Sequence, residues 1–159
     1  MKLLIVSDSH GRLEYMYHAA EREHPDMVFH LGDHDRDAED LSRRFPRLCV
    51  VSMKGNCDYF SPYGREEYLY TLEGVRIFAV HGHQYNVKSG LMRFSYAAAE
   101  KGAQLALFGH THQAFCEKVG DVTLLNPGAC GGYRPTYAVV TVKDGALQCE
   151  IKDFREENK

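Results

Sequence analysis

Short apolar runs alternate with polar loops along the first two thirds of the chain. Each run is a nearly continuous stretch of Leu, Ile, Val, Phe or Ala, the pattern of a strand that is buried on both faces. Such strands are expected at Lys2–Ser7, Asp26–Leu31, Leu48–Lys54, Val75–Val80 and Gln104–Phe108. Between them, the spacing of apolar residues predicts helices at Leu13–Glu23, Ala38–Phe45 and Ser89–Gly102. This part of the chain predicts an α/β fold.

The pattern changes after Thr111, where strand-like segments follow one another without helices between them. These segments are Phe115–Lys118, Val122–Asn126, Thr136–Val142 and Leu147–Ile151, with a turn at Lys143-Asp144-Gly145 before the last. A further strand at Glu66–Leu72 is expected to pair with Val75–Val80 as a hairpin. No linker or repeat divides the chain, so we expect a single domain over residues 1–159, with a frayed charged tail at Arg155–Lys159.

Composition narrows the class of protein. The chain has 159 residues, 44% hydrophobic and 26% charged, which is ordinary for one globular domain and excludes a disordered or fibrous chain. A formal charge of −3 argues against general binding of nucleic acids or anionic membranes, since both need a basic surface. No apolar stretch approaches the roughly 20 residues of a membrane span, and the first apolar run is too short for a signal peptide. We therefore expect a cytoplasmic protein without a membrane partner.

The cysteines give no sign of a disulfide framework. There are five, widely spaced and without a Cys-x-x-Cys pair, so neither disulfides nor a structural zinc site is predicted. Cys49, Cys116 and Cys149 lie in apolar or strand-like surroundings and are expected in the core.

Polar side chains with metal-binding chemistry follow the predicted strands at the points where those strands end. They are Asp8, His10, Asp33, Asn56, His81, His110 and His112. Ligands of open α/β sheets bind beyond the carboxyl ends of the strands, so these side chains are expected at one rim. Imidazole, carboxylate and amide donors together suit Mn, Fe, Co, Ni or Zn, and suit copper(I) and calcium poorly. Such a large set suits two ions about 3.5–4 Å apart that share one carboxylate.

The spacing of these residues supports the same interpretation. Asp8 and His10, like His110 and His112, are two positions apart, so in extended backbone each pair would point to the same face. One histidine alone is more often structural than a ligand. The combination with two aspartates and an asparagine at successive strand ends predicts a metal centre.

In order along the chain, the motifs Asp8-x-His10, Gly32-Asp33, Gly55-Asn56, His81-Gly82-His83 and Gly109-His110-x-His112 resemble those of the calcineurin-like metallophosphoesterases. The short length and Asn56-Cys57-Asp58 are similar to the small YfcE-type phosphodiesterase branch, which is related to the retromer scaffold subunit. The resemblance runs from Asp8 to about Gly128 and implies a four-layer αββα sandwich with two mixed sheets between helices. It also implies that Asp8, His10, Asp33 and His112 hold one metal ion, and that Asp33, Asn56, His81 and His110 hold the other, with Asp33 bridging.

Charge then favours a phosphodiesterase. Two divalent ions contribute +4, Asp8 and Asp33 remove 2 and a bridging hydroxide removes 1, so about +1 remains to attract a phosphodiester anion. Such ions make hydroxide available near neutral pH and polarise the phosphoryl oxygens for in-line attack. Asn56 is expected to steady the developing charge, and His83 to contact phosphate. We expect a small phosphodiester substrate and two divalent ions, with Mn the leading choice before Ni, Zn, Fe or Co. The protein could form a homo-oligomer.

Cys57 departs from the broad family, in which many members carry a His that is credited with protonating the leaving oxygen. A thiol with a reference pKa near 8.5 is a poor replacement for an imidazolium donor. We therefore expect a need for good leaving groups, or proton donation by Asp58 or by water. The rival hypothesis is a catalytically weak or inactive metal-binding scaffold with the same fold. Retention of every ligand position favours the enzyme.

The other histidines and the acidic residues have simpler interpretations. His18 and His24 fall on or near a helix, and strand alternation points His30 away from the ligands. His34 is a candidate for lining the pocket. The acidic run Asp35, Asp37 and Asp40 is most simply a helix N-terminus.

Two further segments leave alternatives open. Asn126-Pro127-Gly128 resembles a turn of the family, but Ala129 replaces the Ser that commonly follows, and a plain turn explains the segment equally well. The tyrosines Tyr59, Tyr63, Tyr68 and Tyr70 predict a substrate-side wall, an oligomer surface or a solvent-facing hairpin with aromatic cross-strand pairs.

Overall fold

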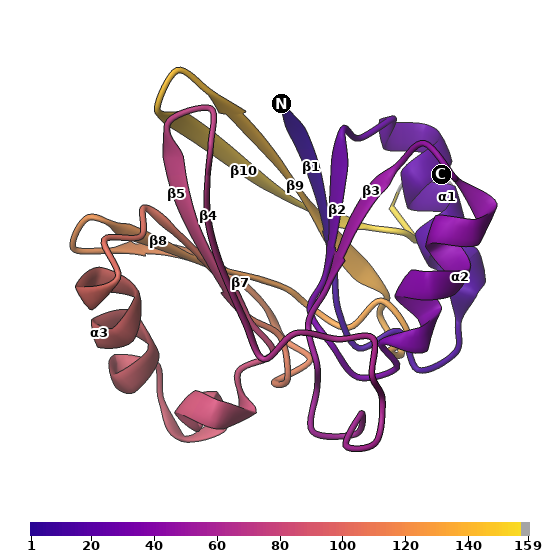
Figure 1. Ribbon diagram of the computed structural model, residues 1–159, viewed down its shortest axis with the longest axis horizontal. Coiled ribbons are helices and arrows are strands. Elements are labelled where there is room, and N and C mark those ends of the chain that lie inside the picture. The colour runs from indigo at the N-terminus through magenta and orange to yellow at the C-terminus, as the bar shows by residue number, and fades with distance from the viewer. Residues whose placement is uncertain (157–159) are drawn as a thin grey trace.

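Two five-stranded sheets pack face to face in the computed structural model, which describes residues 1–156 (Figure 1). The first sheet has the order β10-β9-β1-β2-β3 and the second has the order β4-β5-β6-β8-β7. Helices α1 and α2 lie on the outer face of the first sheet, and α3 lies on the outer face of the second (Figure 1). This is the expected four-layer α/β sandwich. Residues 157–159 of the tail that was expected to fray lie outside the described part.

The element bounds agree closely with the predicted ones. The strands are β1 (Lys2–Val6), β2 (Met27–His30), β3 (Cys49–Ser52), β4 (Glu67–Leu72), β5 (Val75–Val80), β6 (Leu105–Leu107), β7 (Ala114–Val119), β8 (Val122–Pro127), β9 (Thr136–Lys143) and β10 (Ala146–Asp153). The helices are α1 (Leu13–Glu23), α2 (Arg36–Arg44) and α3 (Met92–Glu100), with short 3-10 turns η1 (His83–Tyr85) and η2 (Val87–Ser89) before α3. The two 3-10 turns were not predicted.

Strand direction brings the carboxyl ends together. β1, β2 and β3 run parallel, and so do β5, β6 and β8. In the first sheet β9 pairs antiparallel with both β1 and β10, and in the second sheet the edge strands β4 and β7 pair antiparallel with β5 and β8. Loops that follow the parallel strands therefore leave each sheet at one end.

Alternation along β1 explains the layers. Leu3 and Ile5 belong to the core between the sheets, whereas Leu4 and Val6 pack beneath α1 and α2. All four side chains are fully buried, as expected for a strand covered on both faces. In the other half, Phe94 of α3 is buried against the second sheet.

The prediction that three cysteines lie in the core was wrong for two of them. Cys49 and Cys116 are exposed, because β3 and β7 are edge strands whose side chains partly face solvent. Cys149 on β10 is partly buried against the core between the sheets. The fully buried cysteine is Cys130, in the loop between β8 and β9.

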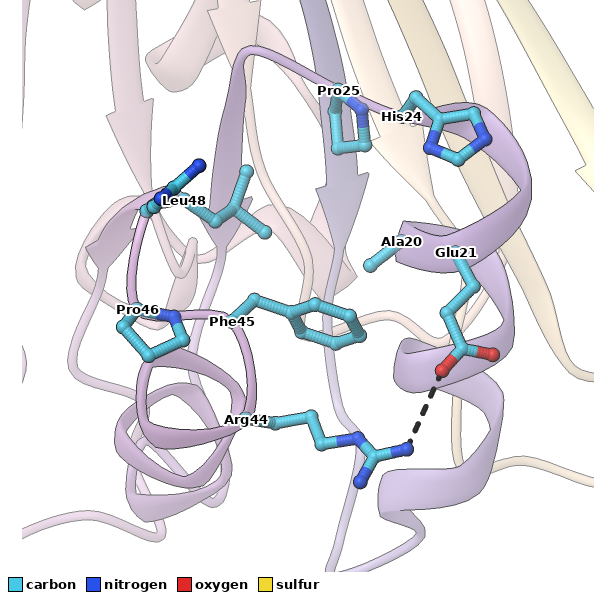
Figure 2. A pocket seen from close by; sticks show the side chains of 9 residues that line it. Ala20, Glu21, His24, Pro25, Arg44, Phe45, Pro46 and Leu48 are labelled. Carbon is cyan, nitrogen blue, oxygen red and sulfur yellow. Dashed lines mark ion pairs between the residues drawn. The ribbon is translucent and has the colours of Figure 1, made fainter.

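A cavity of about 620 Å³ lies between the end of α1 and the segment after α2 (Figure 2). Its lining includes Ala20, Phe45 and Leu48, and an ion pair of 3.6 Å joins Arg44 Nη2 to Glu21 Oε1 across it. These segments lead into the amino ends of β2 and β3, so the cavity is at the opposite end of the sheet from the polar loops. Among the described residues, no helix has the length and apolar character needed to cross a membrane.

Candidate metal centre

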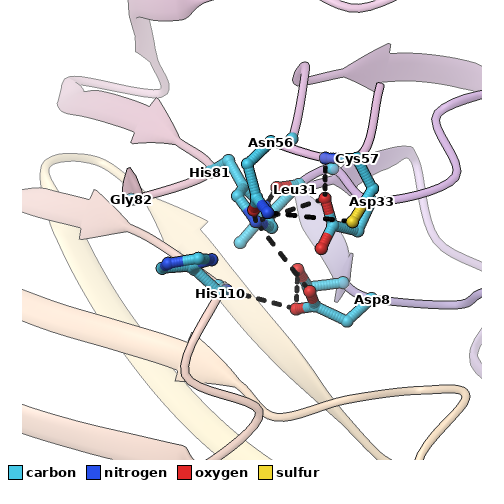
Figure 3. A network of polar contacts seen from close by, with 12 residues as sticks. Asp8, Leu31, Asp33, Asn56, Cys57, His81, Gly82 and His110 are labelled. Carbon is cyan, nitrogen blue, oxygen red and sulfur yellow. Dashed lines mark hydrogen bonds and ion pairs between the residues drawn. The ribbon is translucent and has the colours of Figure 1, made fainter. Parts of the chain in front are cut away.

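The polar loops of both sheets meet at one rim (Figure 3). Asp8 and Asp33 follow β1 and β2 of the first sheet, while His81 and His110 follow β5 and β6 of the second. The backbone N–H of His110 donates to Asp8 Oδ2 at 3.2 Å, and that of Asp8 donates to the carbonyl of Gly32 at 3.0 Å. The site is therefore built across the junction of the two sheets.

The metal-binding side chains form two groups that share Asp33. Asp8, His10, Asp33 and His112 make one group, and Asp33, His81 and His110 make the other. Within each group, the atoms able to bind an ion lie within 4.8 Å of one another. Asn56 adjoins the second group, with its Oδ1 3.1 Å from His81 Nε2. The structure thus brings all seven predicted residues together, in the division that the family resemblance implied.

The backbone beneath these residues is left-handed, so the expectation of extended Asp-x-His and His-x-His pairs was wrong. Positive φ angles occur at Asp8 (54°), His10 (47°), Asp33 (56°), His110 (69°) and His112 (61°). For residues with a side chain this conformation is uncommon and strained, and such residues cluster at functional sites. Tight reversals in the loops, rather than strand alternation, aim these side chains inward.

His81 is held as a lone-pair donor. Its Nδ1 lies 2.6 Å from the carbonyl of Leu31 and must carry the proton there, because a carbonyl can only accept. In the neutral ring Nε2 then carries the lone pair, and this atom lies 3.1 Å from Asn56 Oδ1 and 3.5 Å from Asp33 Oδ1 (Figure 3). A lone pair directed at an amide oxygen and a carboxylate oxygen is the arrangement that a cation between them would stabilise.

The carboxylate of Asp8 divides its two oxygens between protein and site. Oδ2 accepts hydrogen bonds from Ser7 Oγ at 2.6 Å and from the backbone of His110. Oδ1 is buried and accepts no aligned hydrogen bond, although His112 Nε2 lies 3.1 Å away. A buried oxygen left without a donor is unfavourable in the absence of a ligand. Oδ1 is thus placed for a cation.

Neighbouring groups favour the charged forms of Asp8 and His112. Burial raises the pKa of Asp8, but the contact with His112 and the charge of His81 outweigh burial and lower it overall. The 3.1 Å approach of Asp8 raises the pKa of His112. Carboxylate and imidazole attract each other here, and an ion would replace the imidazole proton.

His110 is neutral around pH 7. Burial, followed by the neighbouring charges of His81 and Lys88, lowers the pKa of its imidazole to about 4. A neutral imidazole is the form that binds metal. The donors therefore fit divalent ions of the borderline class that accepts nitrogen and oxygen together.

The four residues predicted for catalysis lie around the second group. The imidazole of His83 lies 5.5 Å from that of His81 between ring centroids, and its Nδ1 is buried without a hydrogen-bond partner. Burial and the charge of His81 lower the pKa of His83. Cys57 and Asn56 are exposed, and the backbone N–H of Cys57 donates to Asp33 Oδ1 at 3.0 Å.

Asp58 is committed to loop structure. Its Oδ1 accepts from the backbone N–H groups of His34 and Asp35 at 2.8 and 3.1 Å, and its Oδ2 accepts from Gly55 at 2.9 Å. The carboxylate is buried. It therefore fixes the loop that carries Asn56 and Cys57 against the loop that carries Asp33.

Several supporting residues were missed by sequence reasoning. Asp37 accepts from Ser9 Oγ at 2.6 Å and from the backbone of Gly11 at 2.8 Å, which fixes the turn around His10. Asp35 accepts from the backbone of Gly64 at 2.9 Å. Both aspartates are buried, so they hold loops in addition to opening α2, and no local sequence signal separates the two tasks.

Asn126 is more than part of a plain turn. It is fully buried, and its Nδ2 donates to the carbonyl of Gly109 and to Thr111 Oγ1, both at 3.0 Å. Its Oδ1 accepts from the backbone of Gly128 at 2.9 Å. The side chain thus fixes the loop that carries His110 and His112. The only feature of the sequence that pointed to this role was the resemblance of Asn126-Pro127-Gly128 to a turn of the family.

The background histidines lie as expected. His18 and His24 are exposed. His30 is fully buried. The hydroxyl of Ser9 donates its proton to Asp37, so the 2.8 Å contact between His30 Nε2 and Ser9 Oγ is a hydrogen bond donated by the imidazole. Burial lowers the pKa of His30, so it is a neutral structural residue beneath the site. His34 is exposed and lines a neighbouring cavity.

Fold and site together define a metal-dependent phosphoesterase. Residues 1–145 match the calcineurin-like phosphoesterase superfamily domain, and the chain belongs to this family. "Probable metallophosphoesterase YsnB" of Bacillus subtilis is 33% identical over 96% of this chain and 91% of its own length. "Phosphodiesterase MJ0936" of Methanocaldococcus jannaschii is 27% identical over 98% of both chains. These relatives are phosphoric ester hydrolases, so the chain is a metallophosphoesterase.

Solved structures share the fold. A Streptococcus pneumoniae structure described as a predicted phosphoesterase is 28% identical, with a TM-score of 0.79 over 96% of this chain and 88% of that chain. Vps29 of Entamoeba histolytica complexed with Zn²⁺ is 19% identical, with a TM-score of 0.73 over 97% of this chain and 99% of that chain. The second likeness concerns the fold alone.

Proposed function

We propose that this chain hydrolyses small phosphodiesters with two divalent ions at the rim. Asp8, His10 and His112 would hold one ion, Asn56, His81 and His110 would hold the other, and Asp33 would contact both. The observation that carries the proposal is the place of Asp33 in both ligand groups. When bound, two such ions supply a nucleophile from water near neutral pH and polarise the phosphoryl oxygens.

The protein's own groups would orient the ester. His83 presents a buried, unpartnered Nδ1 beside the second group, which suits a hydrogen bond to a phosphoryl oxygen. Asn56 lies at the same edge and is exposed to an incoming ligand. Cys57 offers a thiol where an imidazole would be the better acid, so we propose that good leaving groups are preferred. Asp58 would act as a positioning residue rather than as the proton donor, because both its oxygens bind backbone N–H groups.

The donor chemistry also bears on the metal. Two carboxylates, one amide and four imidazoles suit Mn, Fe, Co, Ni and Zn, and Mn remains our leading choice. With two divalent ions, Asp8, Asp33 and a hydroxide, the loaded site would carry a formal charge of about +1, which favours an anionic ester. Elemental analysis of the purified protein identifies the bound ions.

The test combines metal content with turnover. Wild-type protein loaded with Mn²⁺ or Ni²⁺ is expected to bind about two ions per chain and to hydrolyse bis(4-nitrophenyl) phosphate faster than 4-nitrophenyl phosphate. Asp33→Ala should lose both ions and at least 100-fold in kcat/KM. His18→Ala, which removes an exposed imidazole from α1, is the matched control and should leave both unchanged. Unchanged activity in Asp33→Ala would disprove the dimetal mechanism.

The alternative is a metal-binding scaffold with the same fold, and the thiol of Cys57 in place of a better acid is the feature that favours it. Fully loaded protein that turns over neither ester would support this second function. The same two measurements therefore separate the two proposals.

A further inference from the structure

Two large aromatic side chains are exposed next to each other in the loop between β3 and β4. Tyr59 is 76% exposed and Phe60 is 93% exposed. Their rings are in edge contact, with centroids 4.9 Å apart and planes at 88°. Scattered exposed apolar side chains are normal on a protein surface, but an adjacent aromatic pair is typical of a binding surface.

The loop that carries this pair is fixed to the metal centre. Asp58, the residue before Tyr59, binds backbone N–H groups on both sides of the site, and the backbone of Ser61 donates to the carbonyl of Asp58 at 2.9 Å. At the far end of the loop, the backbone N–H of Gly64 donates a hydrogen bond to the buried carboxylate of Asp35. The backbone N–H of Cys57 donates a hydrogen bond to Oδ1 of Asp33, the carboxylate common to both ligand groups. The aromatic pair therefore has a defined position relative to the candidate metal ligands.

A cavity of about 730 Å³ lies between this loop and the start of α2. Its lining includes His34, Arg36, Cys57, Tyr59, Phe60 and Tyr63. Two of these residues, His34 and Cys57, each adjoin a candidate metal ligand in the chain, and the His34 ring lies 6.1 Å from that of His10. The cavity thus lies beside the metal centre and extends to the aromatic rings. Its volume falls within the range of sites for small organic ligands.

The charged side chain of Arg36 indicates which class of ligand the cavity suits. Within residues 1–156, the guanidinium of Arg36 has no ion-pair or hydrogen-bond partner. A guanidinium beside aromatic rings suits a planar, polarisable ring that carries polar groups, since both arginine and aromatic side chains stack on such rings. An aliphatic chain would use the rings but leave Arg36 and His34 without a role.

We propose that this cavity binds a planar aromatic group of the phosphodiester, such as a nucleobase, while the phosphate lies at the metal ligands. This inference rests on the function proposed above and specifies the substrate class of the same site. Tyr59 and Phe60 are then specificity-determining residues that contact the ring, and they take no part in bond cleavage.

The test compares two ligands that share their phosphate and sugar but differ in the ring. Calorimetric titration of metal-loaded protein is expected to give about tenfold tighter binding for adenosine 5′-monophosphate than for ribose 5-phosphate, the scale of one stacked base. Tyr59→Ala combined with Phe60→Ala should reduce this ratio below threefold. The exchange Tyr59→Phe with Phe60→Tyr should preserve it, and so should Tyr96→Ala, which removes another exposed ring, on α3.

The controls separate the remaining explanations. Phenyl phosphate tests whether a simple aryl group is enough for binding. Binding as tight as that of adenosine 5′-monophosphate would indicate a cavity for any aryl group, and weaker binding would indicate a cavity for a nucleobase. Equal binding of the two sugar phosphates by the wild type would overturn the proposal. A wild-type dimer that dissociates in the double alanine variant, with no ring preference, would also overturn it and assign the pair to self-association. Binding is measured without turnover, so the two proposals can fail separately. Absence of hydrolysis would contradict the proposed function, whereas the preference for the ring would still be measured in the titrations.

Discussion

Asp8 and His110 are 102 positions apart, and one hydrogen bond of 3.2 Å from the His110 backbone to the Asp8 carboxylate joins the two sheets at the rim. Asp8 follows a strand of the first sheet and His110 follows a strand of the second. The candidate metal centre therefore depends on how closely the two sheets approach at this point.

Gly109 permits that approach. A Cβ at this position would lie 2.1 Å from Ser7 Oγ and 3.0 Å from Asp8 Oδ2, so Gly109→Ala must displace these side chains or separate the sheets. We expect a loss of about 1–3 kcal/mol in unfolding free energy and a fall of at least tenfold in metal affinity. Urea unfolding and metal titration measure the two effects. Gly120→Ala, where a Cβ meets nothing within 4 Å, should keep wild-type metal affinity.

Asn126 tests the support beneath the histidines. Asn126→Ala leaves the buried N–H of Gly128 without its partner, at about 1–3 kcal/mol, and removes one of two hydrogen bonds to the carbonyl of Gly109, which keeps the one from the backbone of Thr111 at 2.8 Å. We expect the midpoint of thermal unfolding to fall and metal affinity to drop about 10–100-fold, as for other residues that orient ligands. The exposed Gln148→Ala is the control. Unchanged metal affinity in Asn126→Ala would show that the loop keeps its shape without this side chain.

Cys57 tests the leaving-group argument. An imidazole, with a reference pKa near 6.5, is a better acid for the leaving oxygen than a thiol near 8.5. Cys57→His is therefore expected to raise kcat/KM on methyl phenyl phosphate by more than threefold, with a smaller change on methyl 4-nitrophenyl phosphate. Cys57→Ser controls for loss of the thiol. A change below threefold on the phenyl ester would show that protonation of the leaving group does not limit the rate.

Local patterns in the sequence predicted an α/β fold and the meeting of the ligands, whereas the four layers were implied by the family resemblance. The buried run before Asp8 and the one before Asp33 identify parallel strands, and the rule that ligands lie beyond carboxyl ends then places both residues at one rim. No long-range information was required for that step.

The rest depends on tertiary structure. The left-handed backbone at Asp33 and His112 arises from loop contacts that no local spacing encodes, which is why the expected extended geometry was wrong. Cys49 is exposed because β3 is an edge strand, and the order of strands in a sheet cannot be deduced from an apolar run. The supporting role of Asn126 likewise rests on a partner 17 residues away.

Glu23 links α1 to the first sheet and gives stability a dependence on pH. Its buried carboxylate contacts Lys2 Nζ at 2.7 Å and Lys152 Nζ at 2.8 Å, and Tyr137 donates a hydrogen bond to it at 2.8 Å. Burial raises the pKa of Glu23, but the hydrogen bonds from Lys152, Lys2 and Tyr137 outweigh burial and lower it from 4.5 to about 2.

A carboxylate with a lowered pKa stabilises the fold above its unfolded pKa, and this stabilisation is lost as pH falls toward the folded value. The shift corresponds to about 3 kcal/mol at pH 7. Glu23→Gln should therefore lower the unfolding free energy by about that amount at pH 7 and by much less near pH 2.5, as urea titrations at the two pH values would measure. Glu150→Gln is the matched control, since that exposed carboxylate lies 3.9 Å from the same Lys152. It should change stability by less than about 0.5 kcal/mol at both pH values. Equal losses for Glu23→Gln at pH 7 and pH 2.5 would assign its effect to packing rather than to charge.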